Sequence, residues 1–257
     1  MTDPDHGSAL TGKVALITGA GGAIGRATAA LLAARGARVA AVHRPGADLT
    51  ELRAALPAGA EPLFLAADVA SEADVRAYVA ATVQAFGRID IFFNNAGIEG
   101  PQAAIADYPV ADFRHVLEVN VTGVFLGLQA VLPVMVAQGS GSIINTGSIA
   151  SIIGSRQMSG YIASKHAVLG LTRAAALEAA PAGVRVNAIH PGFIESRMLS
   201  DIARNLGGDA DSLVGRVPAG RLGAPNEVAR AVAFLGSDES RYMNGAELVL
   251  DGGLTVG

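Results

Sequence analysis

A tyrosine and a lysine stand four residues apart in the second half of the chain, as Tyr161 and Lys165. Residues at this spacing share one face of a helix, so a phenol and an ammonium can lie close together. Such a pair alone is typical of a helix surface, but here two more polar residues accompany it. Ser148 follows an apolar segment thirteen residues before Tyr161, and Asn120 lies within an earlier helical pattern. The set predicts acid–base chemistry.

The reduction of a ketone places a hydride on carbon and a proton on oxygen. A phenol can supply the proton, but its ordinary pKa of about 10 is too high for efficient catalysis near neutral pH. An ammonium about 4 Å away supplies around 4 kcal/mol at an effective dielectric of about 20, which corresponds to a pKa lowered by about 3 units. We therefore expect Tyr161 to be the general acid–base, with Lys165 lowering its pKa. Ser148 would donate a hydrogen bond to the substrate oxygen.

A glycine cluster lies between the first strand-like segment and an alanine-rich helical pattern. It reads Thr18-Gly19-Ala20-Gly21-Gly22-Ala23-Ile24-Gly25. A glycine-rich turn before a helix lets backbone N–H groups approach a pyrophosphate, and the helix N-terminus adds roughly half a positive charge. A tight turn without a ligand is the alternative. Because a strand precedes the cluster and a helix follows it, we favour a dinucleotide site.

Apolar segments of strand length alternate with helical patterns along the chain. Strands are expected over residues 14–17, 38–42, 62–66, 89–93, 142–145, 184–189 and 247–250. Helices are expected over residues 27–35, 71–86, 110–137 and 161–180. The strand segments are continuously apolar, as in a parallel sheet covered on both faces. We predict an α/β, doubly wound fold with about seven parallel strands flanked by helices, as a single domain over residues 1–257.

The least regular segment, residues 193–224, is rich in Gly, Asp and Ser. It could be a plain surface loop. We interpret it as a substrate lid, because it follows a strand end, where ligands bind in such sheets.

The glycine turn and the Asn, Ser and Tyr-x-x-x-Lys residues together resemble the short-chain dehydrogenase/reductase family over residues 10–253. Ala23 stands where many members have glycine. The resemblance implies a Rossmann fold and hydride transfer between NAD(P)(H) and a ketone or secondary alcohol. It also implies that Lys165 holds the nicotinamide ribose and that Asn120 holds a water linking Lys165 to solvent. The catalytic residues would be Asn120, Ser148, Tyr161 and Lys165.

The same resemblance implies where the cofactor lies. Asp68 would contact the adenine ring, the Asn94-Asn95-Ala96-Gly97 element would line the cofactor cleft, and Ile194 and Ser196 would meet the carboxamide. The full set of expected cofactor residues is Gly19, Gly22, Ala23, Ile24, Gly25, His43, Arg44, Asp68, Val69, Asn95, Ala96, Gly97, Tyr161, Lys165, Pro191, Gly192, Ile194 and Ser196.

The end of the second expected strand bears on cofactor choice. NAD enzymes usually place an acid there to bind the ribose 2′-hydroxyl, whereas this chain has His43 followed by Arg44. Arg44 could pair with a 2′-phosphate. Gly22 occupies a position where many NADP enzymes carry a second basic residue, and Asp48 could reach back toward the ribose. We expect NADP(H) to be favoured over NAD(H).

The substrate is expected to be a small carbonyl or alcohol in a mostly apolar pocket. The expected walls are Ile98, Glu99, Ile149, Ile153, Phe193 and Met198. A 3-oxoacyl carrier-protein reductase is an alternative, although Leu126 and Leu177 stand where such enzymes often have arginines. A lyase or epimerase is another alternative. A non-catalytic nucleotide-sensing protein is disfavoured, because such proteins usually lack one of the four site residues.

Bulk composition excludes several other functions. A net charge of −4 without a basic stripe argues against nucleic acid, and the absence of cysteine excludes disulfides and thiolate catalysis. The five histidines show no metal-ligand spacing. Residues 1–11 do not resemble a secretory signal, and we expect no apolar stretch of about 18 residues that could span a membrane. We expect a cytoplasmic protein, and the family resemblance implies a homotetramer.

Overall fold

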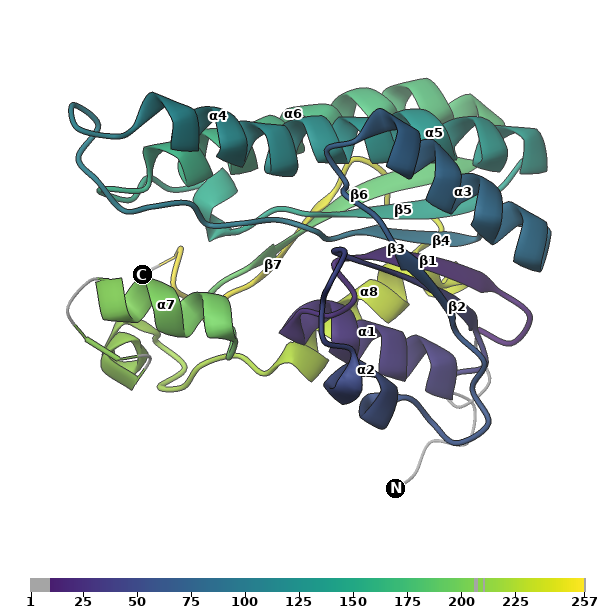
Figure 1. The fold of residues 1–257 in the computed structure, drawn as a ribbon, viewed down its shortest axis with the longest axis horizontal. Helices are drawn as coiled ribbons and strands as arrows, with labels where there is room; N and C mark the ends of the chain where they lie inside the picture. The colour runs from purple at the N-terminus through teal and green to yellow at the C-terminus, as the bar shows by residue number, and fades with distance from the viewer. Residues whose placement is uncertain (1–9, 206–207, 210, 257) are drawn as a thin grey trace.

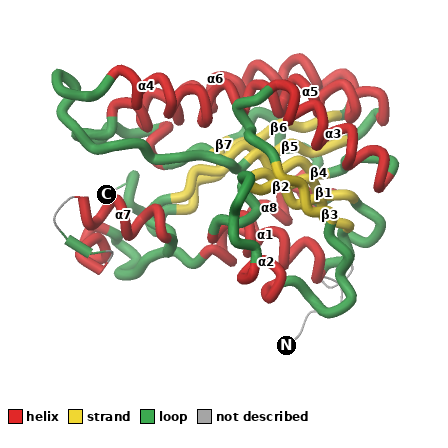
Figure 2. The backbone as a smooth tube through the Cα atoms, viewed as in Figure 1, coloured by secondary structure: helices red, strands yellow, loops and turns green. Residues whose placement is uncertain are grey.

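The computed structural model describes residues 10–205, 208–209 and 211–256. Seven parallel strands form one sheet in the order β3-β2-β1-β4-β5-β6-β7 (Figure 2). The strands are β1 (Val14–Thr18), β2 (Arg38–His43), β3 (Leu63–Ala66), β4 (Ile91–Asn94), β5 (Gly141–Thr146), β6 (Val184–Pro191) and β7 (Glu247–Leu250). The expected doubly wound α/β fold is confirmed. Two expectations fall partly outside the described residues. They concern the N-terminal residues 1–9 and the lid residues 206, 207 and 210.

Helices cover both faces of the sheet (Figure 1). One layer contains α1 (Ala23–Ala34), α2 (Thr50–Ala55) and α8 (Pro225–Gly236). The other contains α3 (Glu72–Phe86), α4 (Val110–Leu117), α5 (Gly123–Gln138) and α6 (Ser159–Ala179). The remaining helix, α7 (Arg197–Asn205), lies beyond the carboxyl ends of the strands. The single domain and its lid over residues 193–224 stay predictions.

Strand residues alternate between two apolar cores. On β4, Phe92 packs into the core beneath α3, α5 and α6, whereas Ile91 and Phe93 pack into the core beneath α1 and α8. All three side chains are fully buried. This two-sided burial is the reason that the strands are continuously apolar in sequence.

Strand β1 pairs with β2 on one side and with β4 on the other. The chain therefore leaves β1 and β4 in opposite directions, and a crevice opens at their carboxyl ends. The candidate site lies at this edge of the sheet.

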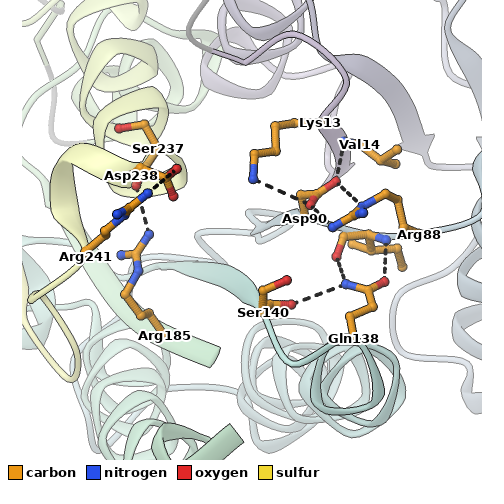
Figure 3. Close-up of polar contacts among 11 residues, drawn as sticks. Lys13, Val14, Arg88, Asp90, Gln138, Ser140, Arg185, Ser237, Asp238 and Arg241 are labelled. Carbon is orange, nitrogen blue, oxygen red and sulfur yellow. Dashed lines mark hydrogen bonds and ion pairs between the residues drawn. The ribbon is translucent and has the colours of Figure 1, made fainter. Parts of the chain in front are cut away.

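Polar side chains at the opposite, amino edge fasten the strand starts (Figure 3). The buried Asp90 carboxylate accepts hydrogen bonds from Val14 N at 2.9 Å and from Arg88 Nη2 at 2.7 Å, and Lys13 Nζ lies 3.8 Å away. The Gln138 amide accepts a hydrogen bond from Ile89 N and donates one to Ile89 O. These contacts fix the entry into β4.

Several sequence expectations need correction. The first helix starts at Ala23 rather than at residue 27, because Gly25 takes part in the helix while packing against the glycine turn. The long helix expected over residues 110–137 is interrupted by a π-turn at Glu118–Thr122. Helices α2, α7 and α8 were not expected.

The expectation that no segment could span a membrane by length and composition is also wrong. The continuous helical run Val110–Gln138 is 29 residues long and contains an 18-residue window with a mean hydropathy of 1.8. Val124, Leu128 and Val131 of this run are buried in the core beneath α5. In this fold, the apolar composition of the run serves packing on the sheet.

Candidate active site

Tyr161 lies in the first turn of α6, half-buried, and Lys165 follows one turn later, 4% exposed. The Lys165 Nζ atom donates a hydrogen bond to Thr146 O at 2.8 Å, at the end of β5. The same atom lies 5.5 Å from the centroid of the Tyr161 ring. The lysine therefore joins the helix that carries the phenol to the sheet edge next to Ser148.

Ser148 starts a short 3₁₀ turn, Ile149–Ser151, after β5. Its Oγ accepts a hydrogen bond from Ala150 N at 3.2 Å, and Ser151 Oγ accepts one from Ser148 N at 3.2 Å. Reciprocal capping of this kind holds the serine in one backbone conformation. Its side chain also lies against the Tyr161 phenol and lowers the pKa of that group.

The electrostatics of the phenol differ from the sequence expectation. Burial raises the pKa of Tyr161, a hydrogen bond with Ser148 partly offsets this rise, and the negative charge of Glu99 raises the pKa again. Burial also lowers the pKa of Lys165 to about 8. Among the protein groups, Lys165 does not offset the effect of burial on the phenol, because both groups are desolvated and Nζ lies beside the ring. The expected lowering of the Tyr161 pKa, to which the positive charge of an oxidised nicotinamide would also contribute, stays a prediction.

Asn120 occupies the middle of the π-turn and is fully buried. Its Oδ1 accepts a hydrogen bond from Ile98 N at 2.8 Å. Its Nδ2 donates to Ile98 O at 2.8 Å and to Ser164 Oγ at 3.0 Å. Both amide donors are therefore engaged, and the side chain braces the strand-end segment against α6.

Gly97 fills the narrow space between this amide and the lysine. A Cβ atom at Gly97 would lie 3.1 Å from Asn120 Oδ1 and 3.5 Å from Lys165 Nζ. The predicted residues Asn120, Gly97 and Lys165 are thus brought together by direct packing.

The glycine turn is packed too closely for side chains. Gly19 has a φ of +66°, and a Cβ on Gly25 would lie 2.3 Å from Gly19 O. Asn95 joins the turn to β4 through bonds from its N to Thr18 Oγ1 at 2.9 Å and from its Nδ2 to Thr18 O at 3.0 Å. Helix α1 begins after Gly22 without a side-chain cap or an acidic first turn. Such a helix N-terminus fits a bound pyrophosphate.

A cavity of about 300 Å³ lies against these elements. The expected site residues that line it are Ile24, Asn95, Gly97, Ser148, Tyr161, Lys165, Pro191, Gly192, Ile194 and Ser196. Four of the expected substrate walls line it as well: Ile149, Ile153, Phe193 and Met198. Ile98 and Glu99 do not line it, which corrects their assignment, and Glu99 acts on Tyr161 only through its charge.

The other expected residues lie outside the cavity lining. Gly19, Gly22, Ala23, Gly25 and Ala96 belong to the glycine turn and its neighbours, and Asn120 braces from behind. His43, Arg44, Asp68 and Val69 lie at the ends of β2 and β3.

Sequence reasoning missed part of the pocket wall. Leu199 and Ile202 of α7 line the cavity, as do Arg216 and Leu254. The guanidinium of Arg216 lies 5.4 Å from the centroid of the Phe193 ring. The apolar residues 198, 199, 202 and 203 have amphipathic helical spacing, a signal that could have revealed α7.

At the end of β2, the side chain of Arg44 is exposed and His43 Nδ1 lies 3.1 Å from Arg44 O. Asp48 accepts hydrogen bonds from Thr50 N at 2.9 Å and Thr50 Oγ1 at 2.7 Å, which lower its pKa. Asp48 is therefore engaged at the start of α2, whereas Arg44 makes no ion pair with the residues that the structure describes.

Residues 19–255 match the family model described as enoyl-(acyl carrier protein) reductase. Levodione reductase of Leifsonia aquatica is 45% identical over 95% of this chain and 94% of its own length. Cyclohexanol dehydrogenase of Acinetobacter sp. strain SE19 is 40% identical over 95% of both chains. A 3-oxoacyl-(acyl-carrier-protein) reductase of Thermotoga maritima is 40% identical over 96% of this chain and 99% of its own length.

Solved structures agree with these similarities. Levodione reductase superposes with a TM-score of 0.94 at 44% identity, covering 96% of this chain and 99% of the other. An NAD⁺-bound xylitol dehydrogenase superposes with a TM-score of 0.88 at 40% identity, covering 95% of this chain and 99% of the other.

Proposed function

Because this chain belongs to the short-chain dehydrogenase/reductase family, we propose that Tyr161, Ser148 and Lys165 are the catalytic residues of its hydride-transfer reaction. The protein is an NAD(P)-dependent oxidoreductase that interconverts an alcohol and a ketone. One observation carries the assignment of residues. All three side chains line the same cavity at the carboxyl ends of the strands, next to the glycine turn.

Each residue has a role that follows from its position. Tyr161 passes a proton to or from the substrate oxygen, and Ser148 positions that oxygen by hydrogen bonding. Lys165, held by Thr146 O, places a positive charge beside the phenol and would hold the nicotinamide ribose. Asn120 keeps the Ile98 segment and Ser164 in place, and its expected catalytic role in holding a water that links Lys165 to solvent stays a prediction. When bound, the nicotinamide supplies or accepts the hydride, and its oxidised form adds the positive charge that the Tyr161 phenolate needs.

We propose a preference for NADP(H). Arg44 is exposed at the end of β2, no acid stands there, and Asp48 is engaged with Thr50. An exposed arginine can pair with a 2′-phosphate. Comparison of kcat/KM with the two cofactors tests this, with an Arg44→Gln variant expected to lose about tenfold with NADP(H) only. A strong NAD(H) preference of the wild-type enzyme would end the proposal.

The substrate that we propose is a compact, apolar ring ketone or its secondary alcohol. The cavity wall is dominated by Ile149, Ile153, Met198, Leu199 and Ile202, which suits a hydrocarbon ring. The relative named for cyclohexanol is consistent with such a ring.

A substrate panel tests the reaction and separates the alternatives. Cyclohexanol, cyclohexanone, levodione and a 3-oxoacyl thioester would each be followed at the absorbance band of reduced nicotinamide. We expect kcat/KM to be highest for the ring compounds. Higher activity on the thioester would favour the 3-oxoacyl reductase alternative, which one relative's name supports. Absence of any cofactor turnover across the panel would contradict the substrate class.

We further propose a cytoplasmic homotetramer. Exposed apolar side chains on α5 and α6, namely Phe125, Val136 and Leu177, are consistent with subunit contacts on this face. Light scattering after size exclusion tests the assembly, and a monomer at micromolar concentration would contradict it. Recovery of the enzyme in the membrane fraction of lysed cells would contradict the location.

A further inference from the structure

One buried histidine touches the candidate site from behind. His190 lies near the end of β6, directly before Pro191, and is fully buried. Its Nδ1 lies 3.0 Å from Ser148 O and 3.3 Å from Ser148 N. Its ring also occupies the space next to Gly147, where a Cβ would lie 2.4 Å from Nδ1. The imidazole thus contacts the main chain on which the Ser148 hydroxyl is carried.

The other ring nitrogen of His190 is not hydrogen-bonded to any described residue. His190 Nε2 has no hydrogen-bond partner among the described residues, although Glu247 Oε2 on β7 lies 3.6 Å away. The second oxygen of Glu247 accepts a hydrogen bond from Arg173 at 2.6 Å. A buried ring nitrogen without a partner costs free energy, so this arrangement calls for a reason.

The two ring nitrogens compete for one proton in neutral histidine. With the proton on Nδ1, the ring donates to Ser148 O. With the proton on Nε2, the ring points an N–H at Glu247 and Nδ1 accepts from Ser148 N. The carboxylate of Glu247 favours the second form, so its position influences which main-chain atom of Ser148 the ring holds.

We propose that His190 is a positioning residue for Ser148, and that Glu247 sets its tautomer. This inference rests on the proposed role of Ser148 in hydrogen-bonding the substrate oxygen. The imidazole fixes the serine main chain, and the Ser148 hydroxyl follows because its backbone is locked by the 3₁₀ turn. A displacement of about 1 Å at such a group can reduce turnover by about 100-fold.

The charges around the ring come from two elements. Burial lowers the pKa of His190, the hydrogen bond with Ser148 and the charge of Glu247 raise it, and Lys165 and Arg173 on α6 lower it. The ring is therefore kept neutral near pH 7, which is the state in which the choice of tautomer matters.

Two near-isosteric variants separate the two ring nitrogens. Asparagine can place a polar atom where Nδ1 lies, and glutamine can place one where Nε2 lies. We expect His190→Asn to keep kcat within about threefold, and His190→Gln to lose about 10- to 100-fold in kcat with little change in cofactor KM. Equal activity in both variants, or wild-type kcat in His190→Gln, would overturn the proposal.

Asn187→Leu is the matched control on the same strand. Asn187 is equally buried, but it bonds to Met243 O and Ala246 N at 2.9 Å, away from the site. We expect this variant to lose stability while its folded fraction keeps wild-type kcat. A loss of kcat as large as that of His190→Gln would show that any damaged bond on β6 reduces turnover, and would contradict a specific role for His190.

A spectroscopic measurement tests the tautomer without turnover. The ¹⁵N shifts of His190 in labelled full-length protein report which ring nitrogen is protonated, and Glu247→Gln should shift the proton toward Nδ1. Arg173→Gln is the control, because it removes the same ion pair and leaves the carboxylate. Unchanged shifts in Glu247→Gln would refute the part of the proposal that concerns Glu247. Failure of the substrate panel would instead refute the proposed reaction and leave these shifts informative.

Discussion

The two edges of the sheet differ in how well their buried polar groups are paired. At the amino edge, the Asp90 carboxylate meets Arg88 and Lys13 and accepts a backbone N–H (Figure 3). At the carboxyl edge, Lys165 is equally buried, yet no carboxylate of the described residues lies within 4 Å of its ammonium, and His190 Nε2 lacks a partner. This fold therefore pairs its buried charges at the amino edge, where they stabilise the strand starts, and leaves buried polar groups poorly compensated at the carboxyl edge, where they can do chemistry.

The largest effect is expected at the carboxyl edge. Tyr161→Phe removes only the proton-transferring hydroxyl and should lower kcat about 1000-fold, without loss of stability. Steady-state kinetics and thermal unfolding measure the two quantities. Tyr78→Phe is the control, since Tyr78 is a buried residue of α3 that does not line the cavity and whose hydroxyl has no hydrogen-bond partner among the described residues, so this variant should leave kcat unchanged. Near-wild-type turnover in Tyr161→Phe would remove the assignment.

The amino edge should show the reverse pattern. Asp90→Ala leaves Arg88 and Val14 N without their acceptor and should lower the unfolding free energy by about 3 kcal/mol. The kcat of the folded enzyme should stay unchanged. Urea titration measures the loss, and Asp238→Ala, which removes an exposed pair with Arg241, should change stability little. A large kcat effect of Asp90→Ala would break the separation between the two edges.

The lysine offers a pH test of the same contrast. Because burial lowers its pKa to about 8, the unfolded state binds more protons than the folded state from about pH 8 upward, and stability rises with pH until the unfolded lysine also titrates. Below this range the buried ammonium costs about 3 kcal/mol, partly offset by its bond to Thr146.

Lys165→Met should therefore be more stable than the wild type by about 2 kcal/mol at pH 7, with the difference shrinking as pH rises above 8. It should also be inactive. Urea titrations of both proteins between pH 6.5 and pH 9.5 measure the difference. A pH-independent difference would contradict the lowered pKa.

The smallest effect is expected at the pocket rim. Among the described residues, Lys165 and Arg216 are the charged side chains that line the cavity, and Arg216 is exposed beside Phe193. Arg216→Gln should raise KM about threefold for ring ketones that bear a carboxylate, with no change for neutral ones. Arg204→Gln, on α7 and paired with Asp201, is the control. An equal change for both substrate types would exclude a charge effect.

The sequence predicted the parts of this molecule that follow regular patterns. Continuous apolar segments revealed the seven strands, and glycines at a strand–helix junction revealed the turn that only glycine can form at Gly19 and Gly25. Spacing placed Tyr161 and Lys165 on one helix face, and the structure brings Ser148 to them.

Burial and long-range contacts could not be predicted in this way. The raised pKa of Tyr161 depends on desolvation, which no local pattern encodes. The contact between His190 and Ser148 joins residues 42 positions apart in sequence. Ile98 and Glu99 were expected in the pocket wall, whereas the Ile98 main chain is hydrogen-bonded to Asn120, a contact between residues 22 positions apart in sequence.

The π-turn at Glu118–Thr122 holds one residue more than a regular α-helical turn. A single-residue deletion there would restore regular winding and leave the downstream helix close to its present orientation. A deletion within α5 itself would instead rotate the residues beyond it by about 100°, so that Leu128 and Val131 would turn away from the sheet. The extra residue is therefore the one place in this helical run where the chain can be shortened while the packing of α5 is kept, and what such a deletion would disturb is the position of the buried Asn120.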